Sequence, residues 1–231
     1  MLITLGFNVL FPLATILIYR SGASFPGWNF YEALLIQAVF TLSNGFAQIM
    51  FHGVMWTTLQ HIREGNYEVV LLRPLNPLFF LIATNFDPEC FGLVIGGGAL
   101  FAFSIAHTGI ASITAIPQFL VLFAGGFAVM AGMQMLMAAM SFKWVGNSRI
   151  PEIFYSIRPL GQYPLTIFPK TVQLIITYMI PVGMIGFFPA SALLGRMESA
   201  ALIAVVPCFL FMLLGVWVYQ FMVRLYEGVG G

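Results

Sequence analysis

Long apolar runs separated by short polar stretches dominate this chain. A transmembrane helix needs about 20 mainly apolar residues to cross a hydrocarbon core of about 30 Å. Six segments meet or approach that length: Leu2–Tyr19, Ala33–Leu59, Phe91–Ala106, Pro117–Phe142, Thr171–Phe188 and Ala200–Val223. The runs are continuously apolar and do not alternate, which argues against a β-barrel. The pattern therefore predicts an all-α polytopic membrane protein with six transmembrane helices.

The polar positions gather in one short segment between the second and third apolar runs. This segment, His61–Pro77, is called the polar island below, and the coupling function considered later is assigned to about residues 60–77. Its 17 positions hold four charged residues, Arg63, Glu64, Glu68 and Arg73. Charge has no role in hydrocarbon, so the polar island is a candidate contact surface for a soluble partner outside the membrane.

Composition supports a membrane class and excludes several others. The 231 residues are 60% hydrophobic and only 7% charged, with a mean hydropathy of +0.96. A soluble domain of this size would need far more charge to cover its surface. The net charge of +1 comes without a basic patch, so no nucleic-acid partner is expected. No linker divides the chain, and residues 1–231 are predicted to form a single transmembrane domain.

The basic residues predict an orientation. Lys and Arg near span ends favour the cytoplasmic side. With both termini cytoplasmic, the polar island and the stretch Lys143–Lys170 lie inside, and only Arg20 and Arg196 lie outside. Seven basic residues are then cytoplasmic: Arg63, Arg73, Lys143, Arg149, Arg158, Lys170 and Arg224. The first apolar run lacks a basic flank and a cleavage site, so it is expected to be a retained span and not a signal peptide.

A polar stripe runs along the second predicted span. Its members follow steps of 4, 3, 4 and 4 residues and share one helix face: Gln37, Thr41, Asn44, Gln48 and His52. Polar side chains within a membrane must face the protein interior or a wet cavity. The stripe could line a substrate pathway, or it could make hydrogen bonds between helices. The sequence leaves both interpretations open.

The fifth predicted span contains a proline. Pro181 should free a backbone carbonyl and bend the helix, and Pro189 should end it near the outer surface. These residues suggest an outer gate that hinges at Pro181, with Met184, Phe187 and Phe188 as its side chains. A static kink filled by neighbouring side chains explains the pattern equally well.

Motifs for catalysis and for metal or nucleotide binding do not occur in the sequence. There is no G-x-x-x-x-G-K-[ST], no H-E-x-x-H and no G-x-S-x-G. The two cysteines, Cys90 and Cys208, are far apart and are expected to be packing residues. The chain is therefore predicted to have no catalytic residue, no metal site and no cofactor of its own, and not to be an enzyme.

The polar island carries a resemblance to a known family. Arg63-x-Gly65 followed by Leu72-Arg73-Pro74-Leu75-Asn76-Pro77-Leu78 resembles the signature of six-span permease subunits of bacterial type-two ATP-binding-cassette (ABC) transporters. Further similar pieces occur in the family's order along most of the chain. These are Gly27-Trp28-x-x-Tyr31-Glu32, Ser141-Phe142-x-Trp144, Leu160-Gly161-x-Tyr163-Pro164-Leu165 and Phe188-Pro189-Ala190.

The resemblance implies an export permease of the bacterial cytoplasmic (inner) membrane. Such a subunit pairs with a second permease, identical or related, and works among membrane lipids. Two separate ATP-binding subunits bind ATP and Mg²⁺ and drive the transport. The segment between spans two and three acts as a coupling helix in such families, which assigns the contact with the ATPase to Arg63, Glu64, Glu68, Arg73, Pro74 and Asn76.

Two other classes compete with the exporter interpretation. A secondary transporter driven by an ion gradient should show repeats and buried ionisable residues, and the sequence shows neither. A membrane-embedded enzyme or assembly factor has no supporting motif. The substrate is not readable from the sequence.

Overall fold

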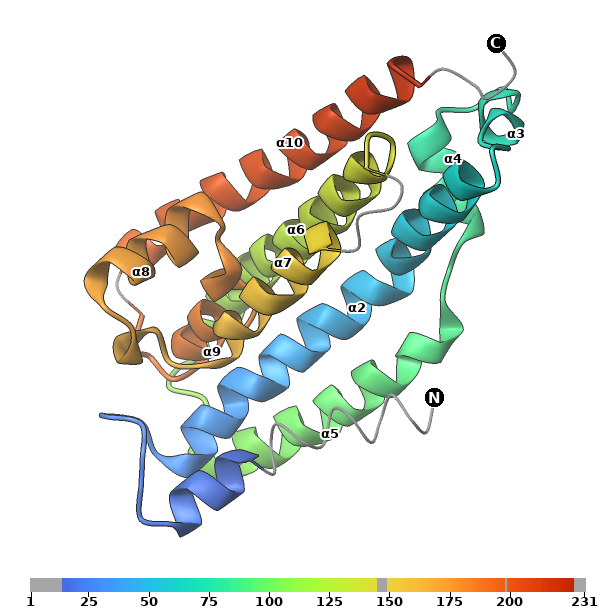
Figure 1. Cartoon of the computed structure of the whole chain (residues 1–231). Helices are drawn as coiled ribbons and strands as arrows, with labels where there is room; N and C mark the ends of the chain where they lie inside the picture. Colours follow the sequence, from blue (N-terminus) through green and yellow to red (C-terminus); the bar gives the residue numbers. More distant parts are fainter. Residues whose placement is uncertain (1–13, 145–148, 198, 227–231) are drawn as a thin grey trace.

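The computed structural model describes residues 14–144, 149–197 and 199–226, and every regular element in those ranges is helical. Four long, nearly aligned helices form the bundle (Figure 1). They are α2 (Phe30–Arg63), α5 (Phe91–Thr108), α6 (Ala115–Ser141) and α10 (Val205–Arg224). The central helix α2 packs on α5 and α6, and α6 packs on α10. The described chain is thus an all-helical, multi-pass membrane protein.

Local capping motifs define both ends of α2. At its start, the Asn29 side chain accepts a hydrogen bond from the Glu32 backbone, and the Glu32 carboxylate accepts one from the Asn29 backbone. This capping box fixes the first turn. At its end, Gly65 has a φ of 67°, and the Asn66 N–H reaches back to the His61 carbonyl. That arrangement is a Schellman motif, which requires the left-handed conformation that glycine adopts most readily.

The predicted second, third, fourth and sixth spans are confirmed as helices long and apolar enough to cross a membrane. The polar island leads into the third span through short elements: α3 (Glu68–Leu71), α4 (Pro77–Thr84) and η1 (Pro88–Cys90). The first predicted span, Leu2–Tyr19, falls mostly outside the described residues, which show helix only at 14–20. The predicted number of six spans therefore stays a prediction.

The stretch after α6 crosses the bundle. It comprises α7 (Arg149–Ile157), η2 (Arg158–Gln162) and η3 (Leu165–Ile167), and it runs antiparallel to α2. The Tyr155 hydroxyl donates to the Met55 sulfur at 3.8 Å, far along α2, whereas Thr166 accepts a 3.1 Å hydrogen bond from the Trp28 indole before α2 starts. The prediction that Lys143–Lys170 stays on one side of the membrane is therefore wrong.

The predicted fifth span, Thr171–Phe188, is also wrong as a single helix. The chain forms α8 (Lys170–Leu174), the π-helical turn η4 (Ile175–Met179), η5 (Val182–Met184) and α9 (Phe187–Leu193). The helix ends before Pro181, where the Val182 N–H donates to the Ile180 carbonyl at 2.6 Å across an inverse γ-turn. Proline has no N–H and forces the preceding residue out of the helical region, so the chain reverses where a kink was predicted.

The reversal makes a re-entrant pair at the end of the bundle that holds Trp28, called the Trp28 end. The descending limb is α8 with η4, and the returning limb is η5 with α9, whose Leu193 carbonyl accepts from Ala111 beyond α5. Pro189 lies in the first turn of α9, so the prediction that it ends a helix is wrong. A further short helix, η6 (Ser199–Ala204), leads into α10.

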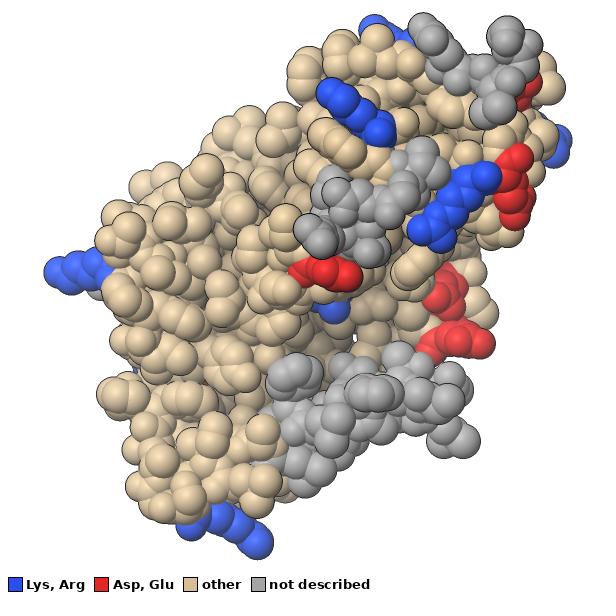
Figure 2. All heavy atoms as spheres, viewed as in Figure 1, with Lys and Arg blue, Asp and Glu red and all other residues tan. Residues whose placement is uncertain are grey.

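This path changes the predicted distribution of basic residues. Lys170 and Arg196 line the same pocket beside Trp28, so Lys170 belongs with the residues predicted to be outside. The predicted bias of seven to two therefore becomes six to three. Charged side chains still gather over the end that carries the polar island, the island end (upper right in Figure 2).

Close backbone contacts hold the re-entrant pair in the bundle. A Cβ atom added to Gly161 of η2 would overlap the Val182 carbonyl oxygen, whereas one added to Gly98 of α5 would meet nothing within 4 Å. We predict that Gly161→Ala lowers the stability of the purified protein by about 1–3 kcal/mol, the usual cost of overpacking. Gly98→Ala is the matched control, since alanine favours a helix by up to about 1 kcal/mol.

Thermal unfolding of both variants in detergent measures the difference. Equal midpoints for Gly161→Ala and Gly98→Ala would show that η2 and η5 do not depend on this contact.

Candidate functional site

The polar island stands clear of the hydrocarbon core. On one side, the Asp87 N–H donates to the Ile49 carbonyl at 3.0 Å, just before apolar α5 begins. On the other, the Tyr31 and His107 rings stack at 4.4 Å, near the end of α5. The 18 residues of α5 span about 27 Å, close to the thickness of a hydrocarbon core. The candidate spans α2 and α5 therefore share a boundary near Tyr31 and His107, and α5 accompanies α2 as far as Ile49.

The rest of α2 carries the polar island outward. Its 34 residues measure about 51 Å, so the turns after Ile49 extend about 20 Å past the start of α5. The segment after α4 follows this extension closely, and the Thr57 hydroxyl donates to the Asn85 side chain at 2.7 Å. The polar island is thus held at a distance that a soluble protein can reach.

A buried tyrosine fixes the polar island to the bundle. Tyr67 is 0% exposed, and its hydroxyl lies 2.8 Å from the Tyr219 hydroxyl on α10. Tyr219 in turn lies 3.1 Å from the Thr58 hydroxyl on α2. The Tyr67 ring also packs edge to face against Phe142 and Tyr226. Burial holds the pKa of the Tyr67 phenol well above its usual range, so this chain of hydroxyls stays neutral.

A second polar network shapes the turn before Tyr67. The Glu64 carboxylate accepts hydrogen bonds from the Gln60 and Asn66 side chains, both at 2.9 Å. His61 Nδ1 lies 2.6 Å from the Asn66 side-chain oxygen. The hydrogen bonds from Gln60 and Asn66 lower the pKa of Glu64. These hydrogen bonds to Glu64 therefore stabilise the turn.

Apolar side chains project from the polar island into solvent. Leu72 is 83% exposed and Val69 is 50% exposed, whereas Val70 on the opposite side of α3 is buried. Exposed charges surround them on Glu68 and Arg73. An apolar centre with a charged rim is the usual composition of a protein–protein interface.

All six predicted coupling residues are exposed on the polar island: Arg63, Glu64, Glu68, Arg73, Pro74 and Asn76. Two of them also hold α4 in place. Asn76 caps this helix by accepting a 3.0 Å hydrogen bond from the Leu78 N–H, and the Arg73 guanidinium lies 5.6 Å from the Phe80 ring centre. Their contact with an ATPase stays a prediction.

The polar stripe on α2 makes contacts within the chain. Gln37 donates to Thr15 of the helix at 14–20, and Thr41 donates to the Gln37 carbonyl. Gln48 donates to the Asn44 side chain at 2.8 Å. Two of the five residues keep a buried atom without a partner among the described residues: Gln37 Oε1 and His52 Nδ1. These bonds suit helix packing, and a pathway along Gln37, Thr41, Asn44, Gln48 and His52 stays a prediction.

Arg158 is a buried cation near the polar stripe that the sequence did not reveal as buried. Arg158 lies over the Tyr155 ring at 5.2 Å, and its Nε is buried without a hydrogen-bond partner among the described residues. The adjoining cavity is about 10 Å³, large enough for about one water, and methionines of α6 line part of it. Within the described ranges, no three His, Cys, Asp or Glu side chains gather as a metal site would require.

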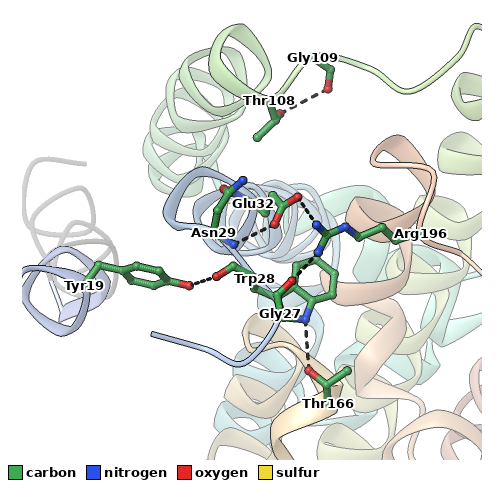
Figure 3. A network of polar contacts seen from close by, with 9 residues as sticks. All are labelled: Tyr19, Gly27, Trp28, Asn29, Glu32, Thr108, Gly109, Thr166 and Arg196. Carbon is green, nitrogen blue, oxygen red and sulfur yellow. Dashed lines mark hydrogen bonds and ion pairs between the residues drawn. The ribbon is translucent and has the colours of Figure 1, made fainter. Parts of the chain in front are cut away.

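The Trp28 end is tied together by one ionic network (Figure 3). Arg196 forms a 2.7 Å salt bridge with Glu32, donates to the Gly27 carbonyl at 2.7 Å and lies 4.9 Å from the Trp28 ring centre. The Trp28 carbonyl accepts from the Tyr19 hydroxyl at 2.8 Å. The network joins the helix at 14–20, the start of α2, η3 and the loop after α9.

The predicted gate residues divide between two environments. Met184 is fully buried beside Gly125 of α6. Phe187 meets the Trp28 ring at 5.4 Å, and Phe187 and Phe188 both line a pocket at the Trp28 end. Whether Pro181, Met184, Phe187, Phe188 and Pro189 act as a hinge and gate stays a prediction.

Comparison with known proteins identifies the family. A family model described as "ABC-2 family transporter protein" matches residues 5–230. The chain belongs to the ABC-2 transporter family. No curated protein and no solved structure matches it.

Membership in the ABC-2 family confirms the resemblance seen in the polar island. It makes this chain the membrane component of an ABC transporter, and it implies association with ATP-binding subunits. It also decides against a secondary transporter driven by an ion gradient. The exposed surface of the polar island is therefore the first candidate contact with an ATP-binding subunit in this ABC-2 protein.

The Tyr67 contacts predict how firmly that surface is held. We expect Tyr67→Phe to cost about 1 kcal/mol, because it removes one buried hydrogen bond. Tyr67→Ala should cost about 3–5 kcal/mol, since the ring packing is lost as well. Tyr226→Phe is the matched control, because the buried Tyr226 hydroxyl has no partner among the described residues.

Denaturant unfolding in detergent gives these differences, and protease cleavage within the polar island reports local loosening. If Tyr67→Ala and Tyr226→Phe behave alike, Tyr67 does not anchor the polar island.

Proposed function

We propose that this chain is the permease subunit of an ATP-driven exporter. It pairs with a second permease, identical or related, and the two form the translocation pathway. Two separate ATP-binding subunits, which hold ATP and Mg²⁺, dock on the polar islands. We place the assembly in a bacterial cytoplasmic membrane with both termini of the chain in the cytoplasm, and the resemblance to type-two export permeases supplies the direction of transport.

The observation that carries this proposal is the exposed Leu72 on a firmly anchored polar island. An 83% exposed leucine in water is costly unless a partner covers it, since burying a leucine contributes about 1.5–3 kcal/mol. Glu68 and Arg73 beside it supply charges that can orient a partner. The island-side extension of α2 carries this surface away from the lipid headgroups, where a soluble ATPase has room to bind.

The anchor also suggests how a movement of the ATPase reaches the membrane. A force on α3 is transmitted through Tyr67 to Tyr219 on α10 and to Thr58 on α2. Because these contacts are buried and neutral, α3 moves with both helices and does not bend as a free loop. The two helices enclose α6 from either side, so a displacement of α3 would alter the spacing of the whole bundle.

The docking surface predicts a specific loss of binding. Leu72→Asp should weaken co-purification of the ATP-binding subunit at least about tenfold, which corresponds to about 1.4 kcal/mol. Ile113→Asp is the matched control, because Ile113 is 84% exposed but lies in the loop at the opposite end of the bundle. Membrane insertion should be normal in both variants.

Charge reversal tests coupling separately from binding. Glu68→Lys and Arg73→Glu should leave ATP hydrolysis running while transport falls, because the rim charges orient the ATPase on α3. The measurement is the ratio of transport to ATP hydrolysis in proteoliposomes. Normal ratios in both variants, together with normal ATPase recovery in Leu72→Asp, would refute the assignment of the polar island.

A further inference from the structure

A pocket of about 530 Å³ opens at the Trp28 end, between the re-entrant pair and the start of α2. Its volume falls in the range of sites for small molecules. Its wall combines two cations, several hydroxyl groups and an apolar side. The residues that matter for the argument are Lys170, Arg196, Thr166, Thr177, Leu174 and Tyr178.

The charge of this pocket is positive. Arg196 is already paired with Glu32 at 2.7 Å, so it is largely neutralised. Lys170 is exposed, and it forms no ion pair with any described residue. Among the described residues, no carboxylate lines the pocket. Lys170 is therefore a cation at the pocket wall with no counter-charge among the described residues.

Hydrogen-bond donors accompany this charge. The Thr166 oxygen accepts from the Trp28 indole at 3.1 Å, which leaves its own O–H free to donate. Thr177 is 7% exposed and also lines the pocket, and its hydroxyl forms no hydrogen bond with the described residues. An ammonium group and a hydroxyl donor that line the same pocket suit a phosphate group.

The limb that carries Lys170 continues as an exposed apolar surface. Leu174 is 61% exposed and Tyr178 is 48% exposed, one and two turns after Lys170. The hydrocarbon boundary lies near Tyr31, close to Trp28, so Lys170 sits at headgroup level and the other two point along the hydrocarbon. A cation above an exposed apolar surface matches a molecule with an anionic head and an apolar tail.

From this arrangement we infer that the pocket binds an anionic phospholipid. The phosphodiester contacts Lys170 and the Thr166 hydroxyl, and one acyl chain lies along Leu174 and Tyr178. A free phosphate would satisfy the cation but would leave the apolar wall uncovered. The bound lipid would then fill the space between the two limbs of the re-entrant pair. This inference is independent of the direction of transport and of the ATPase contact.

Native mass spectrometry of the purified protein tests the lipid site. The protein is presented with an equimolar mixture of phosphatidylglycerol and phosphatidylcholine, and the retained lipids are counted. The wild type should retain phosphatidylglycerol in preference. Lys170→Gln should lower this retention about fivefold, the effect of removing one basic residue near a membrane surface. Lys143→Gln is the matched control, since Lys143 is the only other lysine in the chain and lies at the island end.

Two further measurements separate the sources of phosphate. Excess inorganic phosphate should not displace phosphatidylglycerol, because the tail contributes to binding. Leu174→Gln should weaken retention of the lipid without changing the thermal midpoint, since this side chain is largely exposed. The inference is overturned if Lys170→Gln retains as much phosphatidylglycerol as Lys143→Gln, or if inorganic phosphate displaces the lipid completely.

Discussion

Backbone polar groups within a hydrocarbon core must find partners inside the protein, and this constraint shapes the Trp28 end of the molecule. The chain from Ile180 to Gly186 is not a continuous helix, so it cannot face lipid. It is instead enclosed: Val182, Met184 and Ile185 are each 0% exposed. Glycines make the enclosure possible, because a Cβ on Gly126 of α6 or on Gly161 of η2 would overlap this backbone. The re-entrant pair, and the pocket it encloses, exist only because α6 and η2 seal the turn.

The two ends of α2 are fixed by different physical means. At the Trp28 end, the Arg196–Glu32 salt bridge and the Trp28 ring connect segments far apart in sequence. At the island end, the Tyr67–Tyr219–Thr58 hydroxyl chain is neutral and buried. Charged groups at a membrane boundary remain accessible to ions and lipid headgroups, whereas buried hydroxyl groups are not accessible to them. The helix therefore has one end that responds to its surroundings and one end that is held rigidly.

Hydropathy predicted the helices whose sequences are uniformly apolar, and it failed where polar or helix-breaking residues interrupt the apolar pattern. Thr171–Phe188 is apolar enough for a span, but Pro181 reverses the chain within it. Residues 149–168 cross the bundle, yet Arg158, Gln162 and Pro164 hide that crossing from any apolar window. The exposed residues of the polar island were identified from their charge. Tyr67 was missed, although a lone aromatic residue in a polar segment and a tyrosine at 219 in an apolar run were signals that each needed a partner.

The short limbs of the re-entrant pair also bear on how the protein is made. The helical segments α8 and η4 have 5 residues each and α9 has 7, so neither limb reaches the roughly 20 residues that a helix needs to cross a bilayer. During synthesis, α2 and α6 leave the ribosome before this part of the chain. Its backbone finds shelter only against those earlier helices. The order of helices along the chain therefore also suits assembly, because the packing surfaces of α2 and α6 are synthesised before the re-entrant pair that depends on them.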